Sequence, residues 1–397
     1  MTSADVKDIT FPFRRTTPLV PPTIYHELRE GPPRQVSLKD GSKVWLVTRH
    51  ADVCELLTDD RISSDHTKAG FPQVLPVPPV PGVMSFIRMD DPDHARLRTM
   101  LVRDFSARQI NTMRPGIENI VDDLLERMAQ GPNPADLVDA FTLGVPTRVL
   151  CQLLGVPYAD HEFFEEKTRT IAALSSSPQD GAVALAELSG YLSDLVLRKQ
   201  SEPGDDVLSR LVTNHLAAGD LSVTEVVAIT RLLLTAGFET TAQTLSLSVL
   251  SLLQAPAQLD DLKRNPGLIG SAVHELIRFQ SVVQGGARVA TADIDLADIR
   301  IRAGEGVIYG MLAANNDDQV FPDAGALDLR RDSRRHLAFG YGIHQCLGQY
   351  LARVELEIAL GKLFAAFPTL ALAAPIEEIP FRVDMLIYGL YELPVTW

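Results

Sequence analysis

The segment 222–254 constrains the fold more than any other part of the chain. Ser222 and Glu225 form a capping-box pattern that starts a helix, and Pro256 ends the apolar run that follows. At 1.5 Å per residue, such a helix is about 50 Å long and can cross a whole domain. Because apolar residues cover nearly all of its faces, we expect the helix to lie buried in a large core.

A polar motif interrupts the middle of this predicted helix. The sequence AGFETT, residues 236–241, places Gly237 and Glu239 among apolar neighbours. Glycine destabilises a helix interior by about 1 kcal/mol relative to alanine, and a buried carboxylate is costly without a partner. We therefore expect a polar group or a ligand beside this motif.

The remaining sequence predicts a mainly α protein with a minor β region, arranged as one domain over residues 1–397. Alternating β-branched runs bounded by turn residues predict the strands, whereas spaced apolar positions predict helices. The expected helical parts are about 91–280 and 346–367, and the expected β-rich parts are about 42–48, 288–310 and 380–397.

Composition excludes several classes of protein. The chain has 37 Lys and Arg against 51 Asp and Glu, a net charge of −14, so we expect no nucleic-acid partner. Three scattered cysteines without a CxxC spacing indicate a cytoplasmic protein rather than a disulfide scaffold. Since no apolar stretch reaches the roughly 18–20 residues of a membrane span, we also expect no membrane segment.

Residues 70–82 (GFPQVLPVPPVPG) form an apolar, proline-rich segment. Neither a helix nor an inner strand tolerates so many missing backbone donors, so the segment is predicted to be a loop. Two interpretations stay open: the loop packs on the core, or it forms a wall or lid over an apolar ligand.

A second motif, FGYGIHQCLG at 339–348, surrounds one cysteine. Gly340 and Gly342 allow a tight turn before Cys346, and a helix is predicted to start near that cysteine. Backbone N–H groups and the positive end of the helix dipole favour a thiolate, which is either a nucleophile or a metal ligand. Cys54 and Cys151 lie in apolar helical runs and are predicted to pack as small apolar residues.

At these residues the sequence resembles the cytochrome P450 superfamily, whose cysteine loop reads F-x-x-G-x-H-x-C-x-G. The resemblance extends to the ExxR pair, the AGFETT motif and DDPDHARLR at 90–98, and it is strongest to the bacterial, actinobacterial-type class. It implies the cytochrome P450 fold, with haem b between the long helix and the cysteine loop. It also implies a monooxygenase that inserts one oxygen atom of O2 into a hydrophobic small molecule, such as a secondary metabolite or a xenobiotic.

The resemblance assigns the haem contacts residue by residue. Cys346 is the axial iron ligand, and Phe339 and Gly340 belong to the loop around it. The haem propionates are bound by His94 and Arg98, which are four residues apart on one helix face, and by two further residues, Arg288 and His344. His336 is a weaker candidate for the same role. Without the cysteine loop, His94 and Arg98 would simply be a solvated helix face.

Two further groups of residues receive roles from the resemblance. Glu275, Arg278 and Arg331 form a buried ionic network that holds the cysteine loop. Glu239 and Thr240 are the acid–alcohol pair that delivers protons beside bound O2. The competing interpretation is that Thr240 bonds back to its own helix while Glu239 pairs with a surface cation.

Each of the residues predicted to contact the substrate is apolar and could equally belong to the core. They lie at the pocket positions of the family: Val83, Met84, Leu232, Leu233, Ala236, Val283 and Ile387. Electrons are expected from a separate ferredoxin and ferredoxin reductase, because the haem domain uses the whole length. A basic cluster is expected to steer the acidic ferredoxin: Arg330, Arg331, Arg334 and Arg335.

Three other functions fit the sequence less well than a monooxygenase. A peroxide-driven haem enzyme leaves the acid–alcohol pair without a purpose, and a gas sensor needs an output domain that the sequence lacks. A cysteine hydrolase built on Cys346 and His344 is disfavoured because residues two apart are poorly placed to share a proton.

Overall fold

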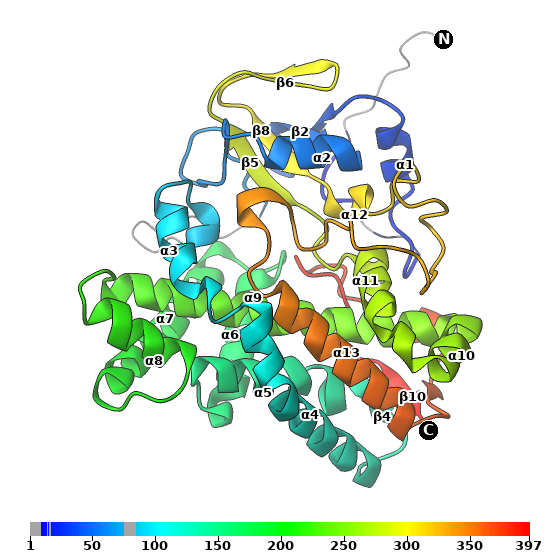
Figure 1. Cartoon of the computed structure of the whole chain (residues 1–397). Helices are drawn as coiled ribbons and strands as arrows, with labels where there is room; N and C mark the ends of the chain where they lie inside the picture. Colours follow the sequence, from blue (N-terminus) through cyan, green and yellow to red (C-terminus); the bar gives the residue numbers. More distant parts are fainter. Residues whose placement is uncertain (1–8, 14, 16, 75–84) are drawn as a thin grey trace.

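The computed structural model describes residues 9–13, 15, 17–74 and 85–397. A helix-rich part and a smaller part that contains the main sheet lie against each other (Figure 1). The helices are α1 (Ile24–Arg29), α2 (His50–Leu57), α3 (Asp93–Val102), α4 (Ala107–Gln130), α5 (Gly144–Leu154), α6 (His161–Ala172), α7 (Pro178–Ser201), α8 (Val207–Leu211), α9 (Val223–Gln254), α10 (Pro256–Arg264), α11 (Ile269–Gln280), α12 (Met311–Ala314) and α13 (Gln349–Ala366).

Helix α9 is the centre of the helical part. Its capping box is present: the Ser222 hydroxyl accepts from the Glu225 N–H at 3.2 Å, and the Glu225 carboxylate accepts from the Ser222 N–H at 2.8 Å. Helices α5, α7, α11 and α13 pack around it, and its side chains are buried on most faces. The predicted long, buried helix is confirmed.

The strands form a five-stranded sheet in the order β1-β2-β8-β5-β3, a three-stranded sheet in the order β4-β10-β9, and a β6-β7 hairpin. Strands β2 and β8 pair in parallel, and the other pairs are antiparallel. The strands are β1 (Arg34–Ser37), β2 (Lys43–Val47), β3 (Ile62–Ser63), β4 (Ala135–Asp136), β5 (Gly286–Ala290), β6 (Ile294–Leu296), β7 (Ile299–Ile301), β8 (Gly306–Tyr309), β9 (Ala371–Leu372) and β10 (Pro394–Thr396). The predicted fold class, mainly α with a minor β region, is confirmed.

The segment between α12 and α13 runs between the two parts of the molecule (Figure 1). It places the cysteine loop directly before α13, which packs on α4 and α9. Helix α13 begins at Gln349 rather than near Cys346 as predicted, so the cysteine precedes the helix by three residues. Within the described ranges, no helix combines the length and the apolar character needed to cross a membrane.

Candidate cofactor site

The cysteine loop depends on two glycines with a left-handed backbone. Gly340 has a φ of 73° and Gly342 a φ of 72°. A Cβ atom at Gly342 would lie 2.4 Å from the Leu57 carbonyl oxygen, so a side chain there would push the loop away from α2. The Cys346 N–H closes the turn by donating to the Phe339 carbonyl at 2.8 Å.

The protein groups around Cys346 act on its thiol in opposite directions. The N–H groups of Gly348 and Gln349 bond the sulfur, and Arg98 and Arg353 add positive charge, all of which lower the thiol pKa. Desolvation of the sulfur acts the other way, and the net effect raises the thiol pKa, although the Cys346 residue as a whole is exposed. A metal ion bound at Sγ would add positive charge, which favours the expected thiolate.

Four basic side chains from three elements meet beside this loop: His94 and Arg98 of α3, Arg288 of β5 and His344 of the single turn Gly342–His344. The His94 and His344 rings lie 4.1 Å apart, and Arg98 Nη2 donates to the Gln345 carbonyl at 2.6 Å. Burial, helped by the charges of Arg288, His94 and Arg98, lowers the pKa of His344 to about 3. His344 is therefore neutral at pH 7, and the positive charge of the cluster comes from Arg98 and Arg288.

Two imidazole nitrogens in the cluster are buried and have no hydrogen-bond partner within the described residues. His94 bonds Asp91 through Nδ1 at 2.9 Å, which leaves Nε2 open. His344 bonds Ser64 through Nε2 at 2.9 Å, which leaves Nδ1 open. Since buried polar atoms are normally paired, these nitrogens and the two arginines fit the carboxylates of a group such as haem. Asp91 and Ser64, which orient the rings, were not anticipated from the sequence.

In the polar motif of α9, Ala236 is exposed although most of the helix is buried. The Thr240 hydroxyl donates to the Ala236 carbonyl at 2.7 Å, as the competing interpretation expected. Gly237 faces α5 instead, because a Cβ atom there would lie 3.1 Å from Leu150. The glycine therefore lets α5 approach α9 closely.

Glu239 is buried and forms an ion pair with Arg382, whose Nη2 lies 2.5 Å from Oε1. The competing interpretation expected a cation on the surface, but Arg382 is buried in the C-terminal loop. Gln243, one turn later, accepts from the Leu390 N–H at 2.7 Å and ties the same loop to α9. Arg382 was missed in the sequence, although a lone arginine in an apolar tail is the kind of residue that a buried carboxylate needs.

The ExxR pair lies at the centre of a fully buried network. Arg278 donates to both carboxylate oxygens of Glu275, at 2.7 and 2.8 Å, and Arg331 Nε approaches Glu275 at 3.3 Å. Arg278 also donates to the carbonyls of Asn315 and Ala324, so it fixes the segment that leads to the cysteine loop. The Ser333 hydroxyl, not anticipated from the sequence, donates to Glu275 at 2.5 Å.

His336, the weaker propionate candidate, lies apart from the basic cluster. Its Nε2 faces His274 Nδ1 at 3.4 Å, and its ring centroid is 5.5 Å from that of Phe339. Burial is the main reason that its pKa falls to about 3. We therefore treat His336 as a neutral, structural side chain.

This low pKa predicts an acid-dependent loss of stability. Below a pH of about 6.5 the unfolded chain binds a proton at His336, whereas the folded chain does not until about pH 3. Unfolding is therefore favoured as the pH falls through this window. At pH 5.5, one unit below the ordinary pKa of histidine, we expect the free energy of unfolding to be lower by about 1.4 kcal/mol. Urea unfolding at pH 7.5 and 5.5 should show a smaller loss for His336→Asn than for the wild type, and equal losses would contradict the assignment.

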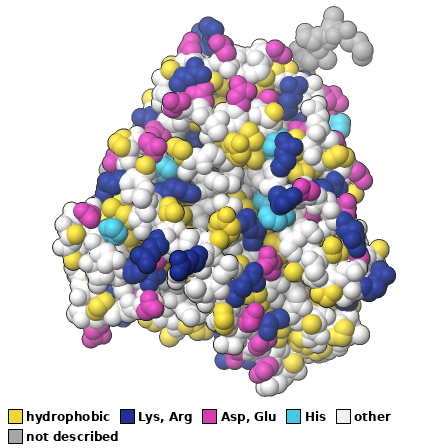
Figure 2. Space-filling view, viewed as in Figure 1, with side chains coloured by type: hydrophobic (Ala, Val, Ile, Leu, Met, Phe, Trp, Pro, Cys, Tyr) yellow, Lys and Arg dark blue, Asp and Glu magenta, His cyan; other side chains and the backbone are white. Residues whose placement is uncertain are grey.

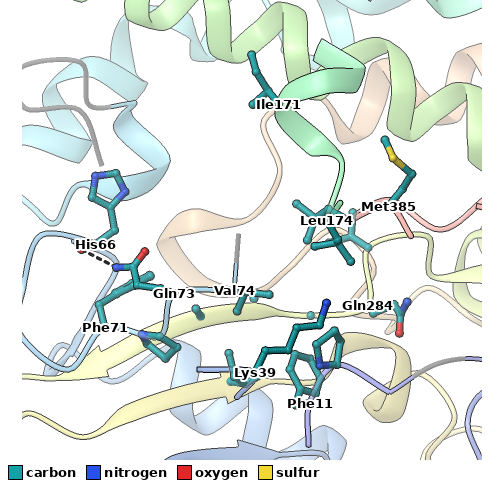
Figure 3. Close-up of a pocket in the computed structure, with 18 of the residues that line it drawn as sticks. Phe11, Lys39, His66, Phe71, Gln73, Val74, Ile171, Leu174, Gln284 and Met385 are labelled. Carbon is teal, nitrogen blue, oxygen red and sulfur yellow. Dashed lines mark hydrogen bonds between the residues drawn. The ribbon is translucent and has the colours of Figure 1, made fainter. Parts of the chain in front are cut away.

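The main cavity among the described residues has a volume of about 550 Å³ and is bounded by the N-terminal segment, the end of α6 and the C-terminal loop (Figure 3). Of the predicted substrate residues, Val283 lines it, and Ile387 pairs with Val283 in a backbone bridge. Leu232, Leu233 and Ala236 of α9 do not line it. Val83 and Met84 lie outside the described residues.

Comparison with known proteins agrees with the geometry. The cytochrome P450 family model matches residues 257–373. Pentalenic acid synthase of Streptomyces avermitilis is 48% identical over 98% of this chain and 97% of its own length, and vitamin D3 dihydroxylase of Streptomyces griseolus is 44% identical over 98% and 96%. The crystal structure of mycinamicin VIII C21 methyl hydroxylase from Micromonospora griseorubida superimposes with a TM-score of 0.94 at 41% identity, covering 98% of this chain and all of that one.

Identity at this level over nearly the whole length shows the family, and the basic cluster and the cysteine loop fit the haem b that the family carries. The chain belongs to the cytochrome P450 family and is a haem-thiolate monooxygenase.

Proposed function

We propose that this monooxygenase hydroxylates a hydrophobic secondary metabolite, with electrons supplied by a ferredoxin and a ferredoxin reductase. The observation that carries the proposal is the cavity of about 550 Å³, which is large enough for a small natural product and borders the C-terminal loop that is bonded to α9. Relatives named for pentalenic acid, vitamin D3 and mycinamicin support a mainly apolar substrate.

In this proposal the chain holds the cofactor with the residues of the basic cluster. Bound haem supplies the iron that binds and activates O2. Cys346 ligates that iron through Sγ, and the N–H groups of Gly348 and Gln349 bond the sulfur. His94 and His344 bind propionate oxygens through their open nitrogens, while Arg98 and Arg288 add charge.

Thr240 is proposed to hold and pass a proton at Oγ1. Its hydroxyl already donates to the Ala236 carbonyl, so it must turn from that oxygen to face a reacting group. Glu239 is proposed to bring protons to Thr240, which requires that its pair with Arg382 opens. The proton path thus depends on movement of the C-terminal loop.

We expect Thr240→Ala to consume electrons at a near-normal rate while hydroxylated product falls by about 10²-fold, because an unassisted proton transfer is slow. Product formed per reduced nicotinamide consumed is the measurement. Thr241→Ala is the matched control, since the Thr241 hydroxyl donates to the Gly237 carbonyl within the buried helix. Equal product yields in the two variants would contradict the role of Thr240.

Isotope labelling tests the reaction class. Product that carries oxygen from labelled O2, and that forms only with an electron donor, supports the monooxygenase reaction with separate redox proteins. Product that forms with hydrogen peroxide alone, at the same rate as with O2 and electrons, would support the peroxide-driven alternative instead.

The basic cluster expected to bind ferredoxin is largely used within the chain. Arg330 forms two bonds to Asp261, Arg331 bonds Glu275, and Arg334 pairs with Asp332. The surface near the cysteine loop instead has exposed Tyr341, Ile343 and Tyr350. Figure 2 shows Lys and Arg side chains gathered on this face, over α3 and beside α13. We therefore propose this face as the docking site.

Arg103, the exposed residue that ends α3, provides the test. We expect Arg103→Glu to weaken the binding of an acidic ferredoxin about fivefold, because one exposed ion pair is worth up to about 1 kcal/mol. Arg330→Gln, which removes a cation already bonded to Asp261, should change the dissociation constant little. Both effects are read by titration at low and high salt, and binding that is independent of salt would exclude the electrostatic face.

A further inference from the structure

The charge of the main cavity is opposite in sign to that of the protein. The whole chain carries a net charge of −14. The cavity lining nevertheless includes the cations Lys39, Arg88 and Arg231, whereas Asp384 is the one carboxylate among the described lining residues. Asp384 itself accepts a hydrogen bond from the Tyr391 hydroxyl at 2.8 Å. An apolar substrate alone does not need this positive wall.

Arg88 is the cation in the lining whose guanidinium forms no hydrogen bond or ion pair with any described residue. It ends the short turn Phe86–Arg88, and its guanidinium carbon lies 5.3 Å from the centre of the Phe71 ring. Burial lowers its pKa, and Arg288 lowers it further, although an arginine remains charged at neutral pH. The side chain is half-buried at the cavity wall, so its charge is only partly solvated, and a carboxylate in the cavity would be a favourable partner for it.

His66 lies beside the same aromatic ring. The His66 and Phe71 ring centroids are 6.4 Å apart, and His66 Nε2 is buried with no hydrogen-bond partner in the described chain. Figure 3 shows His66, Phe71 and Gln73 together on one wall of the cavity. Arg88 and the open His66 nitrogen thus both lie near Phe71 in the cavity lining, and two donors beside an apolar surface suit one end of an amphipathic molecule.

We propose that the substrate carries a carboxylate and that Arg88 binds this group at the cavity wall, with His66 as a second donor. This inference rests on the proposed function and adds the chemical class of the substrate. The apolar lining residues then hold the remainder of the molecule, so the carboxylate fixes which carbon can reach the haem. Arg88 is in this sense a specificity-determining residue that orients substrate and takes no part in the chemistry.

A haem propionate is the other carboxylate that Arg88 could meet, since Arg288 is nearby. The structure favours the substrate because Arg88 lines the cavity, whereas the open nitrogens of His94 and His344 belong to the basic cluster. The two sources differ in their consequences. Loss of a propionate contact lowers haem retention, whereas loss of a substrate contact lowers only the affinity for carboxylates.

The test uses haem-loaded protein and ω-imidazolyl undecanoate, with shorter homologues and the methyl ester of each. The imidazole end of each probe binds the haem iron and shifts the Soret band, so binding of every probe can be measured. The carboxylate or ester at the other end then shows whether the cavity wall prefers a charged group. At low salt we expect the best acid to bind at least about tenfold more tightly than its ester, since a hydrogen bond to a charged group is worth about 1.5–3 kcal/mol.

Arg88→Gln should abolish this preference for the acid, and Arg88→Lys should retain part of it. Lys39→Gln is the matched control, because it removes an exposed cation from the same lining and should keep most of the preference. Equal affinity for acid and ester at every chain length, or a preference that survives Arg88→Gln, would overturn the proposal.

Two other outcomes have separate meanings. Lower haem content in Arg88→Gln, with acid and ester weakened alike, would assign Arg88 to the haem propionates and overturn the inference. A wild-type protein that shows no azole shift at all would instead contradict the proposed function, because that signal requires only accessible haem iron.

Discussion

Replacing Cys346 by serine should eliminate the strongly red-shifted Soret band of the reduced, carbon monoxide-bound protein and lower turnover by at least about 10²-fold. Substitution of a residue that only supports a metal ligand commonly lowers metal affinity or activity about 10–100-fold. Loss of the ligand itself should lower turnover by at least the upper end of this range. Serine keeps the size of the side chain but cannot supply the electron-rich thiolate that promotes O–O cleavage.

The structure makes this substitution informative because the loop does not depend on the sulfur for its shape. Its turn is built by the positive φ angles of Gly340 and Gly342 and by the backbone bond from Cys346 to Phe339. Serine can retain that backbone bond. We therefore expect Cys346→Ser to fold, and Cys346→His to bind haem with a Soret band at the shorter wavelength typical of a nitrogen ligand.

Cys54→Ser is the matched control, since it makes the same atomic change in a half-buried thiol of α2. It should keep the red-shifted band and nearly normal turnover. A red-shifted band that persists in Cys346→Ser, or one that disappears in Cys54→Ser, would show that the iron ligand has been assigned to the wrong cysteine.

The parts of the molecule that could be predicted are those that local sequence determines. Helix α9 carries its own start signal in Ser222 and Glu225 and is apolar on most faces, so its length and burial follow from the pattern. The turn before Cys346 requires glycine at specific positions, and such backbone requirements are visible in a sequence. Both features could therefore be predicted from the sequence.

The parts that were not predicted are contacts between distant segments. Arg382 reaches Glu239 across 143 positions, and Ser64 reaches His344 across 280. No local pattern encodes such a pairing, because each residue alone looks like an ordinary polar side chain. The thiol of Cys346 shows the same limit, since its pKa depends on how densely the folded protein surrounds the sulfur.

Glu275→Gln should lower the free energy of unfolding by about 3–5 kcal/mol, because it leaves the Arg278 guanidinium buried with its carboxylate partner removed. Arg278 would keep the carbonyls of Asn315 and Ala324 and one amide oxygen at position 275, none of which carries a compensating charge. The segment that leads to the cysteine loop would lose its anchor. Urea unfolding of the haem-loaded protein is the measurement, and haem content of the purified protein is the second.

Glu357→Gln provides the matched control, because Glu357 pairs with Arg114 where both side chains are partly exposed, and such pairs contribute about 0–1 kcal/mol. The network acts on the position of the loop and touches no reacting atom, so its loss is a folding defect. The fraction of Glu275→Gln that retains haem should therefore show a normal red-shifted Soret band and near-normal turnover per haem. Unchanged stability with a lowered turnover per haem would instead place Glu275 in the chemistry and contradict the structural role.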